Sequence, residues 1–354
     1  MGTQIDEFQH PDSIWTWSSS PGRGRASVWI PYCKSVEKTK GGWSISYNGG
    51  EVVLDPKKID SVLMYGASGD LPLAFLDALA VHRIPLLVHR RNLPDPYVFV
   101  PGGRRDDADI LSAQIRARDN QTKCAYVART LIKERFRGTG FPVSKLFYQR
   151  LSAARSVESC RRLEAEQSRM LWEQYFAKAG LSEATRRSDN PLSAALDAGS
   201  FFLYGIVLRW TLMHKLSAAH GFLHSTTGYP SLVYDLMEPY RGMVEQAAVT
   251  AYVEGAHDVT AKTLERLKAA LQEPVFVPSH RVSVRRKNLL HGVVLALRSW
   301  LLGESRRLVI PVEGPRIGGR KPKQGYKLPG SAIARTPIEG RRGVSDARVV
   351  RCGG

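Results

Sequence analysis

Three short segments in the second half of the chain carry acidic and imidazole side chains of types that suit work on a phosphate ester. Glu164 lies in a helical pattern, His224 follows an apolar triplet, and Asp235 precedes Glu238 by three residues. On a helix, that spacing points both carboxylates the same way. Two carboxylates and an imidazole suit a hard divalent ion such as Mg²⁺ or Mn²⁺, which can polarise a phosphoryl oxygen. These residue types therefore predict a metal-dependent site for phosphodiester chemistry.

Each of these residues also has an ordinary structural interpretation. Glu164 shares a helix face with Ser168 and Leu171, so a buried salt bridge accounts for it as well as a metal ligand does. Glu166 falls on the wet face and fits a solvent ion pair. A histidine after an apolar triplet is more often packed in a core, and acidic residues often favour the first turn of a helix. Pro239 disfavours an undisturbed helix after Glu238.

Charge is distributed unevenly along the 354 residues. The 51 Lys and Arg exceed the 33 Asp and Glu, for a formal charge of +18. From residue 281 to the end there are 17 Lys and Arg against 4 Asp and Glu, so this part carries +13 of that charge. A basic segment of this kind favours a polyanionic partner, above all nucleic acid, although a solvated tail has the same composition.

Several classes of protein are disfavoured by what the sequence lacks. No apolar run approaches the roughly 18 residues of a membrane span, and the N-terminus has no basic region followed by an apolar one. The four cysteines form no CxxC pair, which argues against a structural zinc site or disulfides and for a reducing cytoplasm. There is no HExxH motif, Walker loop or GxSxG motif. We expect a cytoplasmic protein that does not enter a membrane.

The elements that must position the site fall into two regions. The first hundred residues alternate or cluster strand-forming residues, and one helix begins near Leu71, between two buried strands at 61–65 and 85–88. Helical patterns then cover 111–136, 156–178, 192–219, 248–254, 260–272 and 282–302. We predict an α+β fold with an N-terminal β-rich domain (1–100), a linker (101–107), an all-helical catalytic domain (108–303) and a basic Gly/Pro-rich tail (304–354), disordered or ordered by nucleic acid.

Taken together, these segments resemble CRISPR-associated protein one, the spacer-acquisition integrase, over roughly residues 20 to 302. Gly-Phe-Leu-His-Ser at 221–225 is close to identical to the family's histidine motif. Ser-Leu-x-x-Asp-Leu-Met-Glu-x-x-Arg at 231–241 is similarly close. The basic, Gln-containing segment at 114–119 and the Asn-Pro-Leu segment at 190–192 are similar to two further family helices.

The first metal motif of that family is less well matched. Glu164-Ala165, with Leu171 and Trp172 seven and eight positions on, fits its register, but Leu171 replaces the usual Tyr. Glu166 lies close enough to leave open which glutamate is the first ligand. The loop between the histidine and acidic motifs is about one residue short.

The resemblance implies that Glu164, His224 and Glu238 ligate Mg²⁺ or Mn²⁺, with Asp235 beside them as a further catalytic residue. It also implies a basic residue near the scissile phosphate, which here is Arg241. Together with the basic C-terminal segment, it gives a set of expected nucleic-acid-binding residues: Arg241, Arg285, Arg286, Lys287, Arg320, Lys321 and Lys323.

The implied activity is that of a DNA integrase or endonuclease of CRISPR adaptation. Such an enzyme inserts short DNA fragments into a repeat array by attack of a 3′-hydroxyl on a phosphodiester. The family also implies a homodimer and a small ferredoxin-like CRISPR-associated partner subunit. Two alternatives stay open: a transposase-like integrase that inserts its own element's ends, and a non-catalytic nucleic-acid-binding scaffold.

Overall fold

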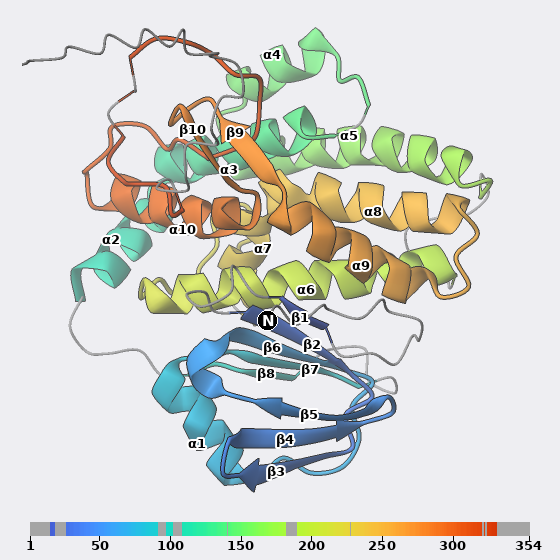
Figure 1. Cartoon of the computed structure of the whole chain (residues 1–354). Coiled ribbons are helices and arrows are strands. Elements are labelled where there is room, and N and C mark those ends of the chain that lie inside the picture. Colours follow the sequence, from blue (N-terminus) through green and yellow to red (C-terminus); the bar gives the residue numbers. More distant parts are fainter. Residues whose placement is uncertain are drawn as a thin grey trace, which may run out of the picture.

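The main sheet of the N-terminal region has five strands in the order β1-β2-β6-β7-β8. The computed structural model of the chain describes residues 15–17, 26–90, 97–101, 108–139, 141–181, 190–226, 228–320, 322 and 324–330. β2, β6 and β7 run parallel, and helix α1 connects β6 to β7. The predicted strand, helix, strand unit is therefore confirmed (Figure 1). The bounds are Trp15–Trp17 (β1), Ala26–Pro31 (β2), Ile59–Tyr65 (β6), Leu73–His82 (α1), Leu86–His89 (β7) and Tyr97–Phe99 (β8).

A second, antiparallel sheet of three strands packs against α1. Its strands are Ser35–Thr39 (β3), Gly42–Tyr47 (β4) and Gly50–Leu54 (β5), followed by a 3-10 turn at Pro56–Lys58 (η1). Trp43 and Ile45 from this sheet meet Phe75 from α1 in a small core. Gly42 has φ of +146°, and a Cβ there would lie 2.2 Å from the carbonyl oxygen of Leu54, so only glycine fits.

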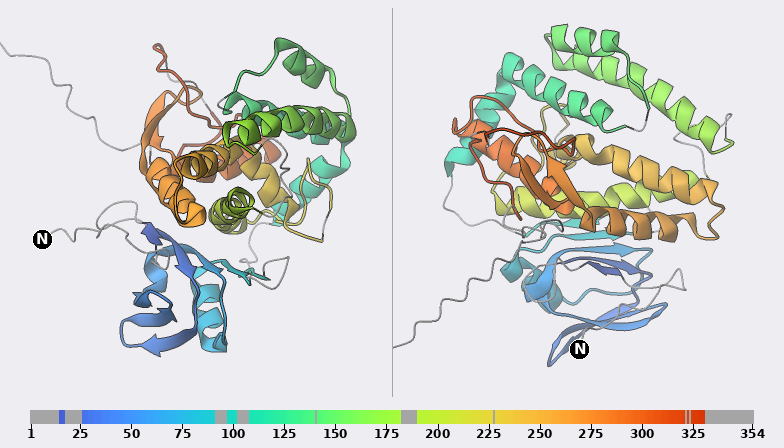
Figure 2. Two further views of the ribbon diagram at one scale, coloured as in Figure 1. Left: turned by 90° about the vertical axis from the view of Figure 1, so that its right-hand side faces the viewer. Right: turned by 45° about the horizontal axis from the view of Figure 1, so that its top comes forward.

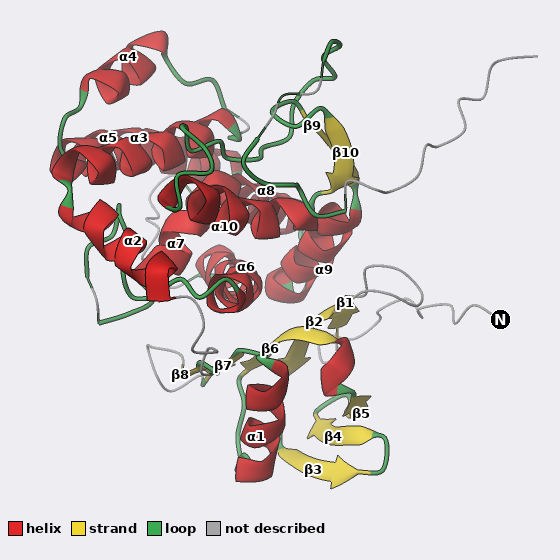
Figure 3. Ribbon diagram, turned by 90° about the vertical axis from the view of Figure 1, so that its left-hand side faces the viewer, coloured by secondary structure: helices red, strands yellow, loops and turns green. Residues whose placement is uncertain are grey.

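The main sheet is buried on both faces because successive side chains of its strands point to opposite sides. Ile30 and Met64 join the small core with α1, whereas Trp29 and Leu63 join the large core of the helical region. Figure 2 and Figure 3 show the strands β1 to β8 gathered at one end of the molecule, with the helices stacked beyond them. The α+β class is confirmed.

Helices make up most of the chain after residue 107. They are Ala108–Asp119 (α2), Gln121–Arg137 (α3), Lys145–Ala153 (α4), Val157–Lys178 (α5), Pro191–Met213 (α6), Ser231–Met237 (α7), Arg241–Val253 (α8), Val259–Gln272 (α9) and Lys287–Leu301 (α10), with a 3-10 turn at Glu238–Tyr240 (η2). A hairpin of β9 (Pro274–Val277) and β10 (Val282–Arg285) lies between α9 and α10.

Three predicted helix boundaries are wrong. The single helix expected at 111–136 is two helices, because the Asn120 side chain accepts the backbone N–H of Lys123 and caps α3. The helix expected at 192–219 ends at Met213. The helix expected at 282–302 begins as strand β10, and α10 starts only at Lys287.

Helix α6 lies between the main sheet and the remaining helices of the region after residue 107, whereas α1 lies on the opposite side of the sheet (Figure 1). Of its 23 residues, 15 are buried, so it is apolar all round rather than on one face. It is long and apolar enough to cross a membrane, but 72% of its most apolar stretch is buried inside the protein, as in the core helix of a folded domain. A Cβ on Gly199 would lie 2.7 Å from Cγ1 of Val244, so α6 and α8 approach very closely.

Arg209 of α6 joins the helical region to the N-terminal region. Its side chain is 1% exposed, and Nη1 donates to the carbonyl oxygens of His82, at 3.2 Å, and of Arg83. These carbonyls end helix α1, where the helix dipole favours a cation.

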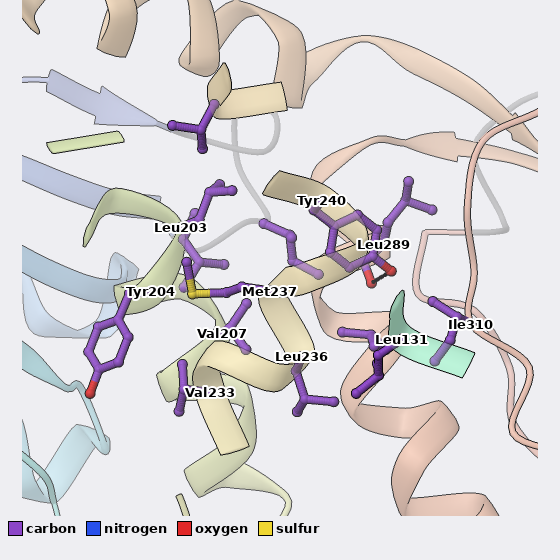
Figure 4. Packing of buried hydrophobic residues seen from close by; sticks show 14 of the residues in the cluster. Leu131, Leu203, Tyr204, Val207, Val233, Leu236, Met237, Tyr240, Leu289 and Ile310 are labelled. Carbon is purple, nitrogen blue, oxygen red and sulfur yellow. Dashed lines mark hydrogen bonds between the residues drawn. The ribbon is translucent and has the colours of Figure 1, made fainter. Parts of the chain in front are cut away.

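Part of the segment predicted to be a disordered tail is packed in the core. Leu308, Ile310 and Leu328 are buried, and the Tyr240 hydroxyl donates to the carbonyl oxygen of Pro311 at 2.9 Å. Figure 4 shows Ile310 among Tyr240, Leu289 and Leu131. The prediction of disorder is therefore wrong for the described part of residues 304–330, while residues 331–354 lie outside the described residues.

Substitution of Gly292 by valine tests this packing. A Cβ at Gly292 would lie 2.4 Å from Cδ1 of Leu328 and 2.8 Å from Cγ of Pro311. We expect Gly292→Val to displace residues 304–330, to lower the free energy of unfolding by about 1–3 kcal/mol, and to speed tryptic cleavage in this segment. Gly318→Ala is the matched control, since nothing lies within 4 Å of its added Cβ. Equal cleavage rates for both variants would contradict the packing.

A partly buried pair of histidines should make the protein sensitive to acid. His214 and His291 approach at 2.7 Å between their Nε2 atoms, and His291 stacks on Trp210. Burial, then the charge of Arg298, lowers the pKa of His214 to about 4, and burial, His214 and Arg209 lower that of His291 to about 3.

The unfolded chain binds these two protons near pH 6.5, well before the folded protein does, so the pair destabilises the fold as the pH drops below 6.5. We expect His291→Phe, which keeps a ring on Trp210, to give a shallower loss of stability between pH 6.5 and 4 in urea unfolding. The exposed His257→Phe should leave the wild-type slope unchanged. Parallel wild-type and His291→Phe curves would refute the assignment.

Candidate active site

The loop that carries His224 is shaped by one buried carboxylate. Asp235 of α7 is fully buried, and its Oδ2 accepts the backbone N–H groups of Phe222, at 2.5 Å, and Leu223, at 2.9 Å. Its Oδ1 accepts the backbone N–H of His224 at 3.0 Å and faces Nδ1 of the ring at 2.7 Å. A carboxylate without water needs such partners. Asp235 therefore fixes the loop and the orientation of the imidazole.

Two side chains of helix α2 hold the same loop from the other side, mainly by donating hydrogen bonds to the carbonyl groups of the loop. The Gln114 side chain, itself buried, donates to the carbonyls of Ser217 and His220 and accepts the backbone N–H of Ser217. Arg118 donates to the carbonyls of Gly221, at 3.0 Å, and Ser225, at 2.5 Å. The loop is thus fixed at both ends.

Gly221 is required where these contacts converge. A Cβ there would lie 2.6 Å from the carbonyl oxygen of His224 and 2.8 Å from Oδ2 of Asp235. Any larger residue would push the loop off its carboxylate, since such separations are shorter than real Cβ contacts. The first position of the histidine motif must therefore be glycine, because any side chain there would clash with the loop and with Asp235.

A cluster of carboxylates surrounds the buried side chain of Arg135 on α3. Nη1 of Arg135 bonds Oε1 of Glu164 on α5 and lies 2.9 Å from Oε2 of Glu238 in η2. Nη2 lies 3.8 Å from Oε1 of Glu245 on α8. Arg135, Glu238 and Glu245 are each about 2% exposed. One guanidinium therefore brings together carboxylates from three separate elements.

Glu238 is held by two arginines. Its second oxygen, Oε1, accepts Nη1 of Arg241 at 2.9 Å. Burial alone would raise the pKa of Glu238, but Arg135, Arg241 and His224 outweigh it and hold the pKa below its usual range. Glu238 is accordingly ionised. Helix α7 ends at Met237 and passes at Glu238 into the 3-10 turn η2, which contains Pro239, so the regular helix is interrupted as the proline predicted.

Glu164 and His224 line one cavity of about 710 Å³. Arg118 from α2 and Arg161 and Arg162 from α5 share its lining, together with the acidic residues Asp119 and Glu158 of the same two helices. Glu164 is 23% exposed at its side chain and His224 is 28% exposed. The cavity therefore offers a partly open imidazole and carboxylate beside cationic groups that suit a phosphate chain.

The His224 imidazole is biased towards its protonated form. Burial alone would lower the pKa of His224, but the hydrogen bond and charge of Asp235, with the charges of Glu238 and Glu164, outweigh it and raise the pKa. With Nδ1 facing the Asp235 carboxylate, the ring keeps a proton on that nitrogen in its neutral form. Nε2 is then the atom that can accept a proton or a metal ion.

The chemistry of the donors suits Mg²⁺ or Mn²⁺, but the described arrangement does not fit an ion. Within the described residues, no three His, Cys, Asp or Glu side chains gather closely enough to hold a metal. The guanidinium of Arg135 instead lies between the carboxylates of Glu164 and Glu238. The structure brings Glu164, Glu238, Asp235 and His224 to one region, with an arginine at its centre.

Glu166 is clearly separated from this cluster. Its carboxylate pairs with Arg150 of α4 at 3.0 Å, and both side chains are about half exposed. The interpretation of Glu166 as a surface ion pair is confirmed, and the geometry favours Glu164 as the member of the site.

The expected nucleic-acid-binding residues have different surroundings. Arg241 contacts Glu238 and does not line the cavity that contains Glu164 and His224. The Arg285 side chain donates to Gln272 at 2.8 Å, while Arg286 pairs with Glu273 and Glu313 and so ties the 304–330 segment to the hairpin. Lys287 begins α10, Arg320 is exposed, and Lys321 and Lys323 lie outside the described residues.

Reasoning from the sequence missed Arg135, Glu245, Arg118, Arg161 and Arg162. The sequence does indicate that Arg135 is unusual, because its neighbours on the helix, Leu131, Ile132 and Phe136, are apolar and buried. A charge inside such a stripe needs a buried partner. The other four belong to helices whose faces can be assigned only once they are packed.

Replacement of Asp235 by asparagine tests the loop. Whichever way the amide turns, its NH₂ faces backbone or ring N–H donors, so at least one buried hydrogen bond becomes a repulsive contact. We expect Asp235→Asn to lower the free energy of unfolding by about 2–4 kcal/mol, and to lower the pKa of His224, measured by NMR titration. Asp77→Asn, at an exposed position, is the control. A variant with unchanged stability and an unchanged His224 pKa would disprove this role.

The chain resembles known proteins in sequence and in fold. Residues 143–267 match the family model of CRISPR associated protein Cas1. A casposase bound to integration product aligns with a TM-score of 0.70 and 17% identity, over 83% of this chain and 96% of that chain. A CAS1 protein from Thermotoga maritima aligns with a TM-score of 0.68 and 17% identity, over 81% of this chain and 100% of that chain.

A chain of a Cas6-RT-Cas1–Cas2 complex aligns with a TM-score of 0.67 and 14% identity, over 85% of this chain and 37% of that longer one. No curated protein sequence matches the chain. The resemblance found in the sequence is confirmed: the chain has the fold of Cas1 proteins, and its residues 143–267 match the model of the CRISPR-associated Cas1 family.

Proposed function

We propose that this protein is a DNA integrase of CRISPR adaptation that inserts short DNA fragments into a repeat array. The observation that carries the proposal is that Glu164 and His224 share one cavity with Arg118, Arg161 and Arg162. A carboxylate and an oriented imidazole next to cationic side chains suit chemistry on a phosphodiester. The Cas1 and casposase folds of the relatives support the same reaction class.

In the proposed step, the 3′-hydroxyl oxygen of a DNA fragment attacks a phosphorus atom at the boundary of a repeat. A new P–O bond forms, the bond from that phosphorus to the repeat strand's own 3′-oxygen breaks, and the released strand ends in a 3′-hydroxyl. One proton leaves the attacking hydroxyl and one joins the leaving oxygen. No covalent enzyme intermediate is needed. With water in place of the hydroxyl, the same site would hydrolyse DNA.

The chain's own residues have distinct parts in this step. Asp235 holds a proton on Nδ1 of His224, so the lone pair of Nε2 is left for the divalent ion, which His224 would hold together with Glu164 and Glu238. Arg118, Arg161 and Arg162 neutralise phosphate oxygens at the cavity. Arg241, Arg285, Arg286, Lys287, Arg320, Lys321 and Lys323 remain candidates for contacts with the DNA backbone outside it.

The cofactor and the assembly are part of the proposal. Dependence on Mg²⁺ or Mn²⁺, with Glu164, His224 and Glu238 as ligands, rests on the family resemblance and on the donor types. So do the homodimer, a cytoplasmic location and a small ferredoxin-like CRISPR-associated partner subunit. The relative that belongs to a Cas6-RT-Cas1–Cas2 complex supports a partner of this kind.

A transposase-like integrase is the second candidate, because a casposase aligns over most of both chains. Choice of substrate separates the two. An enzyme of CRISPR adaptation joins short fragments of varied sequence to a repeat, whereas a transposase-like enzyme requires the ends of its own element.

Substitution of His224 by alanine tests the proposal against a scaffold without catalysis. We expect His224→Ala to reduce joining of a short DNA duplex to a repeat-bearing plasmid in Mn²⁺ by about 100-fold, since it removes one of the three expected ligands together with its orienting contact to Asp235. DNA affinity, measured at fixed salt, should stay within about twofold, because phosphate contacts dominate it. The exposed His257→Ala is the control. If His224→Ala joins DNA as well as wild type, the catalytic assignment is wrong.

A further inference from the structure

Arg135 stands where the two acidic ligands of the expected metal site meet. Its Nη1 contacts carboxylate oxygens of both Glu164 and Glu238. We propose that Arg135 is an internal counter-cation, which keeps the site closed without metal and competes with the divalent ion for Glu164. This inference rests on the metal dependence contained in the proposed function.

Burial and pairing fix Arg135 itself in place. Its side chain is 2% exposed and contacts carboxylates from α5, η2 and α8. Moving it out would take its positive charge away from the buried carboxylates of Glu238 and Glu245, which is more costly than turning a carboxylate that already faces solvent. The arginine is therefore the fixed part of the cluster.

Glu164 is the part that can move. It is the most exposed carboxylate of the three, at 23%, and it lines the cavity together with His224. Its Oε1 accepts both Arg135 and the Ser168 hydroxyl, the latter at 2.8 Å. Rotation of this one side chain away from Arg135 would turn its carboxylate into the cavity.

The charges of the cluster leave room for a divalent ion. Glu164, Glu238, Glu245 and Asp235 are four carboxylates, and Arg135 and Arg241 supply two positive charges beside them. The carboxylates of this set therefore outnumber its arginines by two. The Nε atom of Arg135 is also buried without a hydrogen-bond partner among the described residues, so the closed state does not satisfy this arginine fully.

Two opposite outcomes follow for metal affinity. If Arg135 competes with the ion, its removal frees Glu164 and removes a positive charge from the ion's neighbourhood, so the ion binds more tightly. If Arg135 instead positions Glu238 as a ligand, its removal weakens binding. The sign of the change decides between the two.

The experiment measures Mn²⁺ binding to the full chain without DNA, by isothermal titration calorimetry and by electron paramagnetic resonance of free Mn²⁺. We expect Arg135→Gln to bind Mn²⁺ at least about tenfold more tightly than wild type. The control is Arg137→Gln, which removes the same charge two residues along α3 from a side chain that is 53% exposed and pairs with Glu134. Its affinity should equal that of wild type.

A double variant places the ion at this site. In Arg135→Gln combined with Glu164→Gln, the gain in affinity should disappear. If Arg135→Gln binds Mn²⁺ equally or more weakly than wild type, or if the double variant keeps the gain, the inference is overturned. None of these readouts uses strand transfer, so failure of the proposed activity in a joining assay is a separate result.

Arg135→Lys covers the case in which Arg135→Gln does not fold. Lysine keeps a charge but cannot bridge two carboxylates with a planar fork, so Glu164 is released only in part. We expect Mn²⁺ to bind this variant a few-fold more tightly than wild type and to raise its melting temperature by more than it raises that of wild type. An equal or smaller thermal shift, with equal or weaker binding, would overturn the inference.

Discussion

The site depends on the requirement that a carboxylate removed from water must have its hydrogen bonds made by the protein. Asp235 is fully buried, and it meets this requirement with three consecutive backbone N–H groups and the ring of His224. In the interior of a regular helix or sheet, these N–H groups would be bonded to backbone carbonyls instead. The loop must therefore curve around Asp235, and this curvature is what aims the imidazole at the cavity.

The same requirement organises the neighbouring cluster, with a different result. Glu238 and Glu245 lie in the interior and are neutralised by arginines rather than by backbone groups. The hydrogen bond and charge of Asp235 raise the pKa of His224 despite burial, and the charges of Glu238 and Glu164 add to this effect. The buried carboxylates therefore influence the protonation of an imidazole that lines the open cavity.

The sequence predicted the segments of the site better than their contacts. His224, Asp235 and Glu238 were recognisable because their motifs are short and local, and the spacing of Asp235 and Glu238 is a property of one helical turn. Arg135 was missed because its partners are 29, 103 and 110 residues away, and such pairs arise only from packing. The packed part of residues 304–330 was missed for a related reason. Its Gly and Pro content indicates loop, but Leu308, Ile310 and Leu328 find a core formed by distant helices.

The two glutamates that pair with Arg135 are not equivalent. Glu238 is inside, with an arginine on each oxygen, so its position is set by the fold whether or not a ligand is present. Glu164 is on the wall of the cavity, and one hydroxyl and one shared guanidinium hold it. Protein sites that change state usually do so through the less constrained member of a pair, because the other is coupled to the whole core. The asymmetry between an inner and an outer carboxylate therefore gives the site a fixed half and an adjustable half, and any group that reaches the cavity acts on the adjustable one.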